Sequence, residues 1–164
     1  ASLGYQVTAV DNVPLRVRQA EAMYGAHNPR LKYSVVDVLD LAQVQALGVF
    51  DYALDRAWYH VMRSAETRRR YVESCARLLR PGGRLFLKAM SELEPAGWGP
   101  SREAADEVAA VFSPRFRVVE QLVTSLSTTL THQPKALLCV LERREAWEER
   151  LLEEERDEPT SGAP

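Results

Sequence analysis

Asp11, Asp37 and Asp55 are the residues of this sequence with the clearest potential for ligand chemistry. Each stands directly after a short apolar run that is typical of a buried strand. The carboxyl ends of parallel strands form the ligand-binding edge of open α/β sheets, where an acid can accept hydrogen bonds from the ribose hydroxyls of a nucleotide. The three positions therefore predict a nucleotide site along one edge of a sheet.

The acid that binds ribose normally follows a glycine-rich, phosphate-binding turn by about 20 residues. Only ten residues precede Asp11, and the chain begins with alanine instead of methionine. We therefore expect the glycine-rich turn and the strand that feeds it to lie upstream of Ala1. On this interpretation the chain is the larger, C-terminal part of a nucleotide-binding enzyme domain whose first β-α unit is missing.

Arg56 and His60 extend the candidate chemistry beyond Asp55. A neutral imidazole can act as a general base or hold a substrate, so Asp55 and His60 are candidate catalytic residues. Structural roles stay open for the same side chains. An ion pair between Asp55 and Arg56 could fix the loop, and His60 could cap a helix or pack on Trp58.

The first two acids also have structural alternatives. Asp11 could cap the helix that Pro14 opens, because Asp is preferred before a helix and Pro is tolerated in its first turn. Asp40 competes with Asp37 as a ligand residue, but it is better placed to cap the helix predicted over Asp40–Leu47.

Composition excludes several classes of function. The net charge of −2 implies no general affinity for nucleic acid, and no apolar run reaches the roughly 18 residues that span a bilayer. No Gly-x-x-x-x-Gly-Lys loop or zinc-ligand spacing occurs. Cys75 and Cys139 stand on apolar positions, which favours reduced core cysteines and a cytoplasmic location. We expect neither a metal nor a membrane partner.

Apolar runs alternate with helical patterns, which predicts a largely parallel sheet covered by helices. The predicted strands are Tyr5–Val10, Lys32–Val36, Phe50–Leu54, Arg84–Met90, Phe116–Ser127 and Lys135–Glu142. The predicted helices are Pro14–Tyr24, Asp40–Leu47, Ala65–Leu79 after a Ser64 cap, Ser101–Phe112 with Ser101 as its cap, and Arg143–Glu155. The short turn before the last strand predicts an antiparallel hairpin. Residues 1–143 then form one domain, and residues 144–164 form a charged helical extension with a disordered tail.

Two motifs resemble the class I S-adenosylmethionine-dependent methyltransferases. The segment Phe50–His60 is similar to the Phe-Asp…Asp-Arg-Gly-x-Phe-His segment of small-molecule enzymes related to thiopurine and tellurite methyltransferases. Ala57 replaces the usual Gly and Tyr59 the usual Phe. The second motif, Leu78–Leu85, contains the Leu-Arg-Pro-Gly-Gly end of a helix that is frequent in this superfamily. The resemblance covers about residues 1–143.

The resemblance implies a Rossmann-like sheet with strand order 3-2-1-4-5-7-6, mostly parallel, with a C-terminal antiparallel hairpin. The missing first strand would be central, so its loss would expose two strand edges through which homo-oligomers could form. S-adenosylmethionine is the implied cofactor. Leu54–Ala57 stands where methyltransferases of nucleic acids and protein amides carry Asn/Asp-Pro-Pro-Tyr/Phe, which favours a small-molecule methyl acceptor.

The resemblance also implies roles for individual residues. Asp11, with Asn12 beside it, would hold the ribose. Asp37 would accept a hydrogen bond from the adenine amino group, and the backbone of Val38 would contact the ring edge. The stretch from Asp55 through Arg56 to His60 would face the methyl group, with its first two residues also contributing to cofactor binding. His132 in the hairpin turn and Trp98 in the preceding loop are weaker candidates for the substrate site.

Two other functions remain open at this point. A chain without the central strand could be a non-catalytic Rossmann-like partner module that another polypeptide completes. A nicotinamide-dependent oxidoreductase would use Asp11 equally well, although no Tyr-x-x-x-Lys pattern follows and the terminal hairpin fits methyltransferases better.

Overall fold

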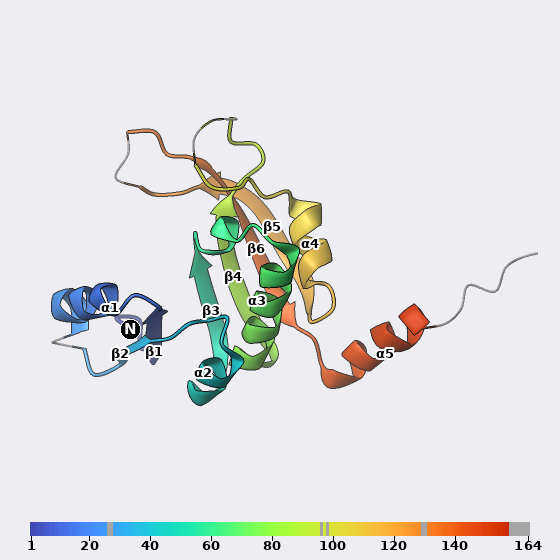
Figure 1. Ribbon diagram of the computed structural model, residues 1–164, viewed down its shortest axis with the longest axis horizontal. Coiled ribbons are helices and arrows are strands. Elements are labelled where there is room, and N and C mark those ends of the chain that lie inside the picture. The colour runs from blue at the N-terminus through green and yellow to red at the C-terminus, as the bar shows by residue number, and fades with distance from the viewer. Residues whose placement is uncertain (26–27, 96, 98, 129–130, 158–164) are drawn as a thin grey trace, which may run out of the picture. The chain divides into compact units, whose positions relative to one another are not determined.

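The computed structural model describes residues 1–164 except 26–27, 96, 98, 129–130 and 158–164 (Figure 1). It divides into two compact units, Ala1–Gly48 and Val49–Pro164. No helix among the described residues is both long enough and apolar enough to cross a membrane.

The first unit is a two-stranded parallel sheet with its helices. Its elements are β1 (Val7–Asp11), α1 (Pro14–Ala20) continued by a π-helical turn (Glu21–Gly25), β2 (Leu31–Val35) and α2 (Leu41–Ala46). Pro14 stands in the first turn of α1, where its missing N–H group costs no hydrogen bond. The Asp40 side chain accepts hydrogen bonds from the backbone N–H groups of Ala42 and Gln43, so the prediction of Asp40 as the cap of α2 is confirmed.

The second unit is a four-stranded mixed sheet in the order β3-β4-β6-β5. Its elements are β3 (Phe50–Arg56), a 3₁₀ turn (Tyr59–Val61), α3 (Ala65–Leu78), β4 (Leu79–Met90), α4 (Ala105–Phe112), β5 (Phe116–Ser125), β6 (Lys135–Arg143) and α5 (Ala146–Asp157). The β3–β4 pair is parallel, and β6 is antiparallel to both of its neighbours. This is the 4-5-7-6 part of the strand order that the sequence resemblance implies, so the predicted Rossmann-like α/β sheet and its hairpin are confirmed.

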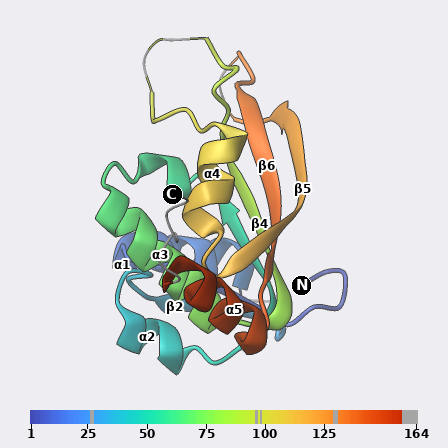
Figure 2. The same cartoon turned by 90° about the vertical axis from the view of Figure 1, so that its right-hand side faces the viewer.

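Helices α3 and α4 cover one face of this sheet, as both views show (Figures 1 and 2). Between them and the strands lies an aromatic core. The Phe112 ring lies 5.6 Å from the rings of both Tyr59 and Phe116, and all three side chains are fully buried. Cys75 and Cys139 are buried, free thiols, as the sequence predicts.

Local signals mark most boundaries, and two exceptions have tertiary causes. Ser64 caps α3 as predicted, accepting a hydrogen bond from the N–H group of Thr67 at 3.0 Å. The prediction that Ser101 caps the next helix is wrong, since α4 begins only after Ala104. The Ser101 N–H group donates instead to the His60 carbonyl at 3.1 Å, and the N–H group of Glu103 donates to the Met90 carbonyl. These bonds hold residues 101–103 extended.

The second exception is the segment 80–83, which lies between the predicted helix Ala65–Leu79 and the predicted strand Arg84–Met90. It belongs to β4 as an irregular insertion, because Phe50 pairs with Leu79 and Tyr52 already pairs with Arg84. Gly83 is required there, since a Cβ atom would lie 2.8 Å from the Arg80 carbonyl oxygen. The predicted charged helix is present as α5, and the tail predicted to be disordered lies almost wholly outside the described residues.

Candidate functional site

Asp11 and Asp37 lie at the same edge of the β1–β2 pair. The two strands run in parallel register and end together, where the Val36 N–H group donates to the Asp11 carbonyl at 3.1 Å. In each acid, Oδ1 accepts a backbone N–H group two residues ahead, that of Val13 at 2.8 Å and that of Leu39 at 2.9 Å. Among the described residues, no group donates to Oδ2 of either acid. Each carboxylate therefore presents one free acceptor at this edge.

The turn after β2 adds a free donor to these acceptors. The backbone N–H group of Val38 makes no hydrogen bond to the described part of the chain, and Val38 is only half-buried. Asn12 lies exposed in the turn after β1. The alternative that Asp11 caps α1 is wrong, because the N-cap of that helix is Val13 and no side chain makes a capping hydrogen bond there. Asp11 Oδ1 accepts the N–H group of Val13 in the turn before the helix.

Asp55 has a different environment, because its carboxylate is turned into the protein. Its side chain is 6% exposed, and it accepts hydrogen bonds from the N–H groups of Trp58 at 2.9 Å and Tyr59 at 3.0 Å. The Tyr71 hydroxyl of α3 donates to it at 2.7 Å. Burial raises the pKa of Asp55, and these three hydrogen bonds oppose that rise because they favour the charged form. The carboxylate thereby fixes the turn that follows β3.

The backbone of this turn explains one feature of the sequence motif. Ala57 has a φ angle of 71°, in the left-handed region that disfavours residues with a Cβ atom. The related methyltransferase segments usually carry Gly at this place. Arg56 donates to the Ser127 carbonyl, and not to Asp55, so the alternative of an Asp55–Arg56 ion pair is wrong.

His60 lies in the 3₁₀ turn and is 5% exposed. Its Nδ1 atom accepts the backbone N–H group of Met90 at 2.8 Å, at the end of β4. An acceptor nitrogen carries no proton, so the neutral ring must carry its proton on Nε2. Burial also lowers the pKa of His60, which favours the neutral form. Trp58 packs on Tyr71 at 5.2 Å between ring centroids.

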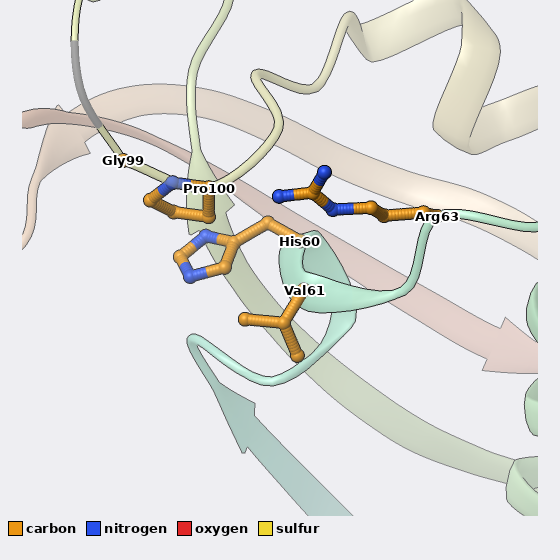
Figure 3. Close-up of a pocket in the computed structure, with 5 residues that line it drawn as sticks. All are labelled: His60, Val61, Arg63, Gly99 and Pro100. Carbon is orange, nitrogen blue, oxygen red and sulfur yellow. The ribbon is translucent and has the colours of Figure 1, made fainter.

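His60 forms one wall of a pocket with a volume of about 610 Å³. The other lining residues are Val61, Arg63, Gly99 and Pro100, which come from the turn after β3 and the loop after β4 (Figure 3). The pocket thus lies at the carboxyl ends of the two parallel strands of the second unit, where open α/β sheets bind ligands.

Arg68 holds the two walls of this pocket together. Its guanidinium donates to the Met62 carbonyl at 3.1 Å and to Glu103 Oε1 at 2.7 Å, and it lies 4.6 Å from the centre of the Tyr59 ring. Glu103 is 1% exposed and follows the pocket loop. Arg68 lies three residues before the buried Tyr71, and this helical spacing places both on the same face of α3.

The loop after β4 is also tied to the hairpin turn. Glu94 accepts hydrogen bonds from His132 Nε2 and from the backbone N–H group of Lys135, both at 2.7 Å. Arg102 donates to three carbonyl oxygens of the same loop. His132 therefore has a loop-bracing contact, and the candidate Trp98 lies outside the described residues. The described part of the chain holds no cluster of three potential metal ligands.

Comparison with known protein families decides the identity of the fold. A family model described as a methyltransferase domain matches residues 1–83, half of the chain. The chain belongs to the methyltransferase domain family.

Individual relatives agree with this assignment. The ubiquinone biosynthesis O-methyltransferase of Xanthomonas oryzae is 33% identical over 109 residues, which make up 66% of this chain and 44% of that protein. The chain thus spans less than half the length of this curated relative. A SAM-dependent methyltransferase from Methanosarcina mazei has a TM-score of 0.71 at 17% identity, covering 87% of this chain and 84% of its own. The N-methyltransferase NodS from Bradyrhizobium japonicum has a TM-score of 0.67 at 16% identity, covering 85% and 67%.

Membership of the methyltransferase family confirms the resemblance drawn from the motifs at Phe50–His60 and Leu78–Leu85. The structural matches are below 25% identity and support the fold alone. The roles of the individual site residues stay predictions, and the hydrogen bonds of each residue suggest how its role can be tested.

The buried Asp55 carboxylate should be essential for stability. In Asp55→Asn the side-chain NH₂ group would face N–H and O–H groups whose hydrogen bonds the carboxylate accepts in the native protein. These buried donors would lose their acceptor, at a cost of about 2 kcal/mol or more. Urea unfolding should show this loss. Asp51→Asn is the matched control, because Asp51 lies on the same strand with a side chain 63% exposed. Equal stability of the two variants would contradict the anchoring role.

His60 should stay neutral at physiological pH with its proton on Nε2. The lowered pKa means that its stabilising contribution is complete above the unfolded pKa of about 6.5 and is lost as the pH falls through the folded value. Imidazole ¹⁵N chemical shifts recorded from pH 8 to pH 5 would report both the tautomer and the pKa. An imidazolium at pH 6.5, or a proton on Nδ1, would contradict the hydrogen bond from Met90.

Proposed function

We propose that this chain binds S-adenosylmethionine and serves in methyl transfer to a small-molecule acceptor. The observation that carries the proposal is the polar edge of the first unit. Asp11 and Asp37 each offer one free carboxylate oxygen, and Val38 offers a free N–H group. Two acceptors and one donor at the carboxyl ends of parallel strands match the hydrogen-bonding groups of an adenosine.

Asp11 is the residue for the ribose. Its Oδ2 atom accepts a hydroxyl hydrogen, while Oδ1 is held by the N–H group of Val13 and fixes the carboxylate plane. A charged acceptor binds a hydroxyl more strongly than a neutral one. Asn12, exposed in the same turn, provides an additional polar side chain for the sugar.

Asp37 and Val38 are the residues for the adenine. Oδ2 of Asp37 accepts a hydrogen of the exocyclic amino group, and the N–H group of Val38 donates to a ring nitrogen. The Asp37 carboxylate and the Val38 N–H group are adjacent, and they complement the amino group and the ring nitrogen that are adjacent on the adenine edge. The Asp37 backbone is itself fixed, because its N–H group donates to the Gln43 side chain at 3.0 Å.

S-adenosylmethionine supplies an electrophilic methyl group when bound. The residues of the second unit position the acceptor: Asp55 anchors the turn after β3, and His60 projects from it into the pocket. With Nδ1 occupied by Met90, His60 can donate from Nε2 and cannot take a proton there without rearranging. This geometry favours a role for His60 in holding the acceptor over a role as general base. Orientation then provides most of the acceleration.

A small acceptor is supported by the size of the pocket, about 610 Å³, which lies within the range of small-molecule sites. The name of the curated relative points the same way, since that protein is a ubiquinone biosynthesis O-methyltransferase.

Substitutions in the first unit test the cofactor site. Asp11→Asn and Asp37→Asn should each weaken S-adenosylhomocysteine binding about ten-fold or more, because each removes a charged acceptor worth about 1.5–3 kcal/mol. Asp40→Asn is the matched control, since Asn caps a helix as well as Asp and Asp40 already serves α2. Isothermal titration calorimetry would measure all three. Affinities that are equal in the Asp11 and Asp37 variants and the control would contradict the assignment.

A further inference from the structure

Two polar groups of different character face the pocket of the second unit. His60 presents the N–H group of a neutral ring, and Arg63 presents a cation (Figure 3). Within the described residues Arg63 makes no hydrogen bond or ion pair. Its side chain extends toward His60 and Pro100 (Figure 3). The pocket therefore contains a positive charge that the described protein leaves unneutralised.

The walls that carry these groups are fixed by hydrogen bonds in the free protein. Arg68 donates to the carbonyl of Met62, the residue before Arg63, at 3.1 Å. The His60 carbonyl accepts the N–H group of Ser101, the residue after Pro100, at 3.1 Å. A ligand that enters the pocket does not need to order these walls, so less binding free energy is lost on association.

The other lining residues that the structure describes carry no polar side chain. Val61 is 53% exposed and faces the pocket together with Pro100. A rigid pyrrolidine ring and a branched aliphatic side chain offer van der Waals contact to a flat hydrocarbon or aromatic body. The pocket thus combines one cationic end, one neutral donor and an apolar surface.

We propose that the methyl acceptor is a small aromatic monoanion whose carboxylate binds Arg63. Another oxygen of the same molecule, outside the carboxylate, accepts a hydrogen bond from the Nε2–H group of His60. A guanidinium matches a carboxylate through two parallel N–H donors. Among the described lining residues, Arg63 is the one unpaired cation, and it balances one negative charge. That the bound anion is a methyl acceptor rests on the function proposed above, whereas the binding of the anion does not.

The test uses the full chain without cofactor and two probes that differ in charge, 3-hydroxybenzoate and 3-hydroxybenzamide. Each is titrated into ¹⁵N-labelled protein while the amide signals of Val61, Arg63 and Gly99 are followed. We expect 3-hydroxybenzoate to shift these signals and to bind at least about five-fold more tightly than the amide. Arg63→Gln should remove this preference, because the two probes then meet the same neutral side chain.

Arg69→Gln is the matched control, because it removes one positive charge from the exposed face of α3, outside the pocket lining. This variant should keep the preference for the carboxylate probe. Equal affinity for the two probes, no binding of either, or a preference that survives Arg63→Gln would overturn the proposal. Binding of S-adenosylhomocysteine is measured separately on the same samples. If the protein prefers the carboxylate probe but does not bind S-adenosylhomocysteine, the result would count against the methyltransferase function and still support the anion site.

Discussion

The buried carboxylate of Asp55 is the constraint on which the candidate pocket depends. An ionised group removed from water costs several kcal/mol unless it is paired. Asp55 recovers this cost through two backbone N–H groups of its own turn and the Tyr71 hydroxyl of α3. The turn after β3 is therefore tied to the helix that covers the sheet. His60 follows Tyr59 in the same turn, so this anchor fixes its backbone, and the N–H group of Met90 fixes the direction of its ring.

A second buried charge completes the arrangement. Arg68 and Glu103 pair at 2.7 Å, although 35 residues separate them in the chain. Removal of one partner would leave the other charge buried and unpaired, which is far more destabilising than loss of an exposed pair. The pair joins α3, which follows the turn after β3, to the extended residues 101–103, which follow the loop after β4. Together with the bond between Ser101 and His60, it keeps the pocket open between two braced walls.

Features that depend on neighbours in the chain were predictable from the sequence. The Asp40 and Ser64 caps and the hairpin of β5 and β6 follow from capping chemistry and apolar runs. The order of the four strands was implied by the family resemblance. Ser101 failed as a cap because its N–H group bonds to a residue 41 positions away, which no local pattern reports. The burial of Glu103 escaped prediction for the same reason. The three acids lie at strand ends, as predicted. The inward orientation of the Asp55 side chain depends on its hydrogen bond with Tyr71, which the sequence does not reveal.

The proposed function depends above all on the edge formed by Asp11, Asp37 and Val38, which we infer to be an adenosine site. The most direct measurement is a titration of S-adenosylhomocysteine into ¹⁵N-labelled protein, with NADH as the comparison ligand. We expect a saturable shift of the Val38 amide signal with S-adenosylhomocysteine, because that N–H group gains its hydrogen bond in the complex. A Val38 signal that stays unchanged at saturating ligand, or that responds to NADH alone, would contradict it.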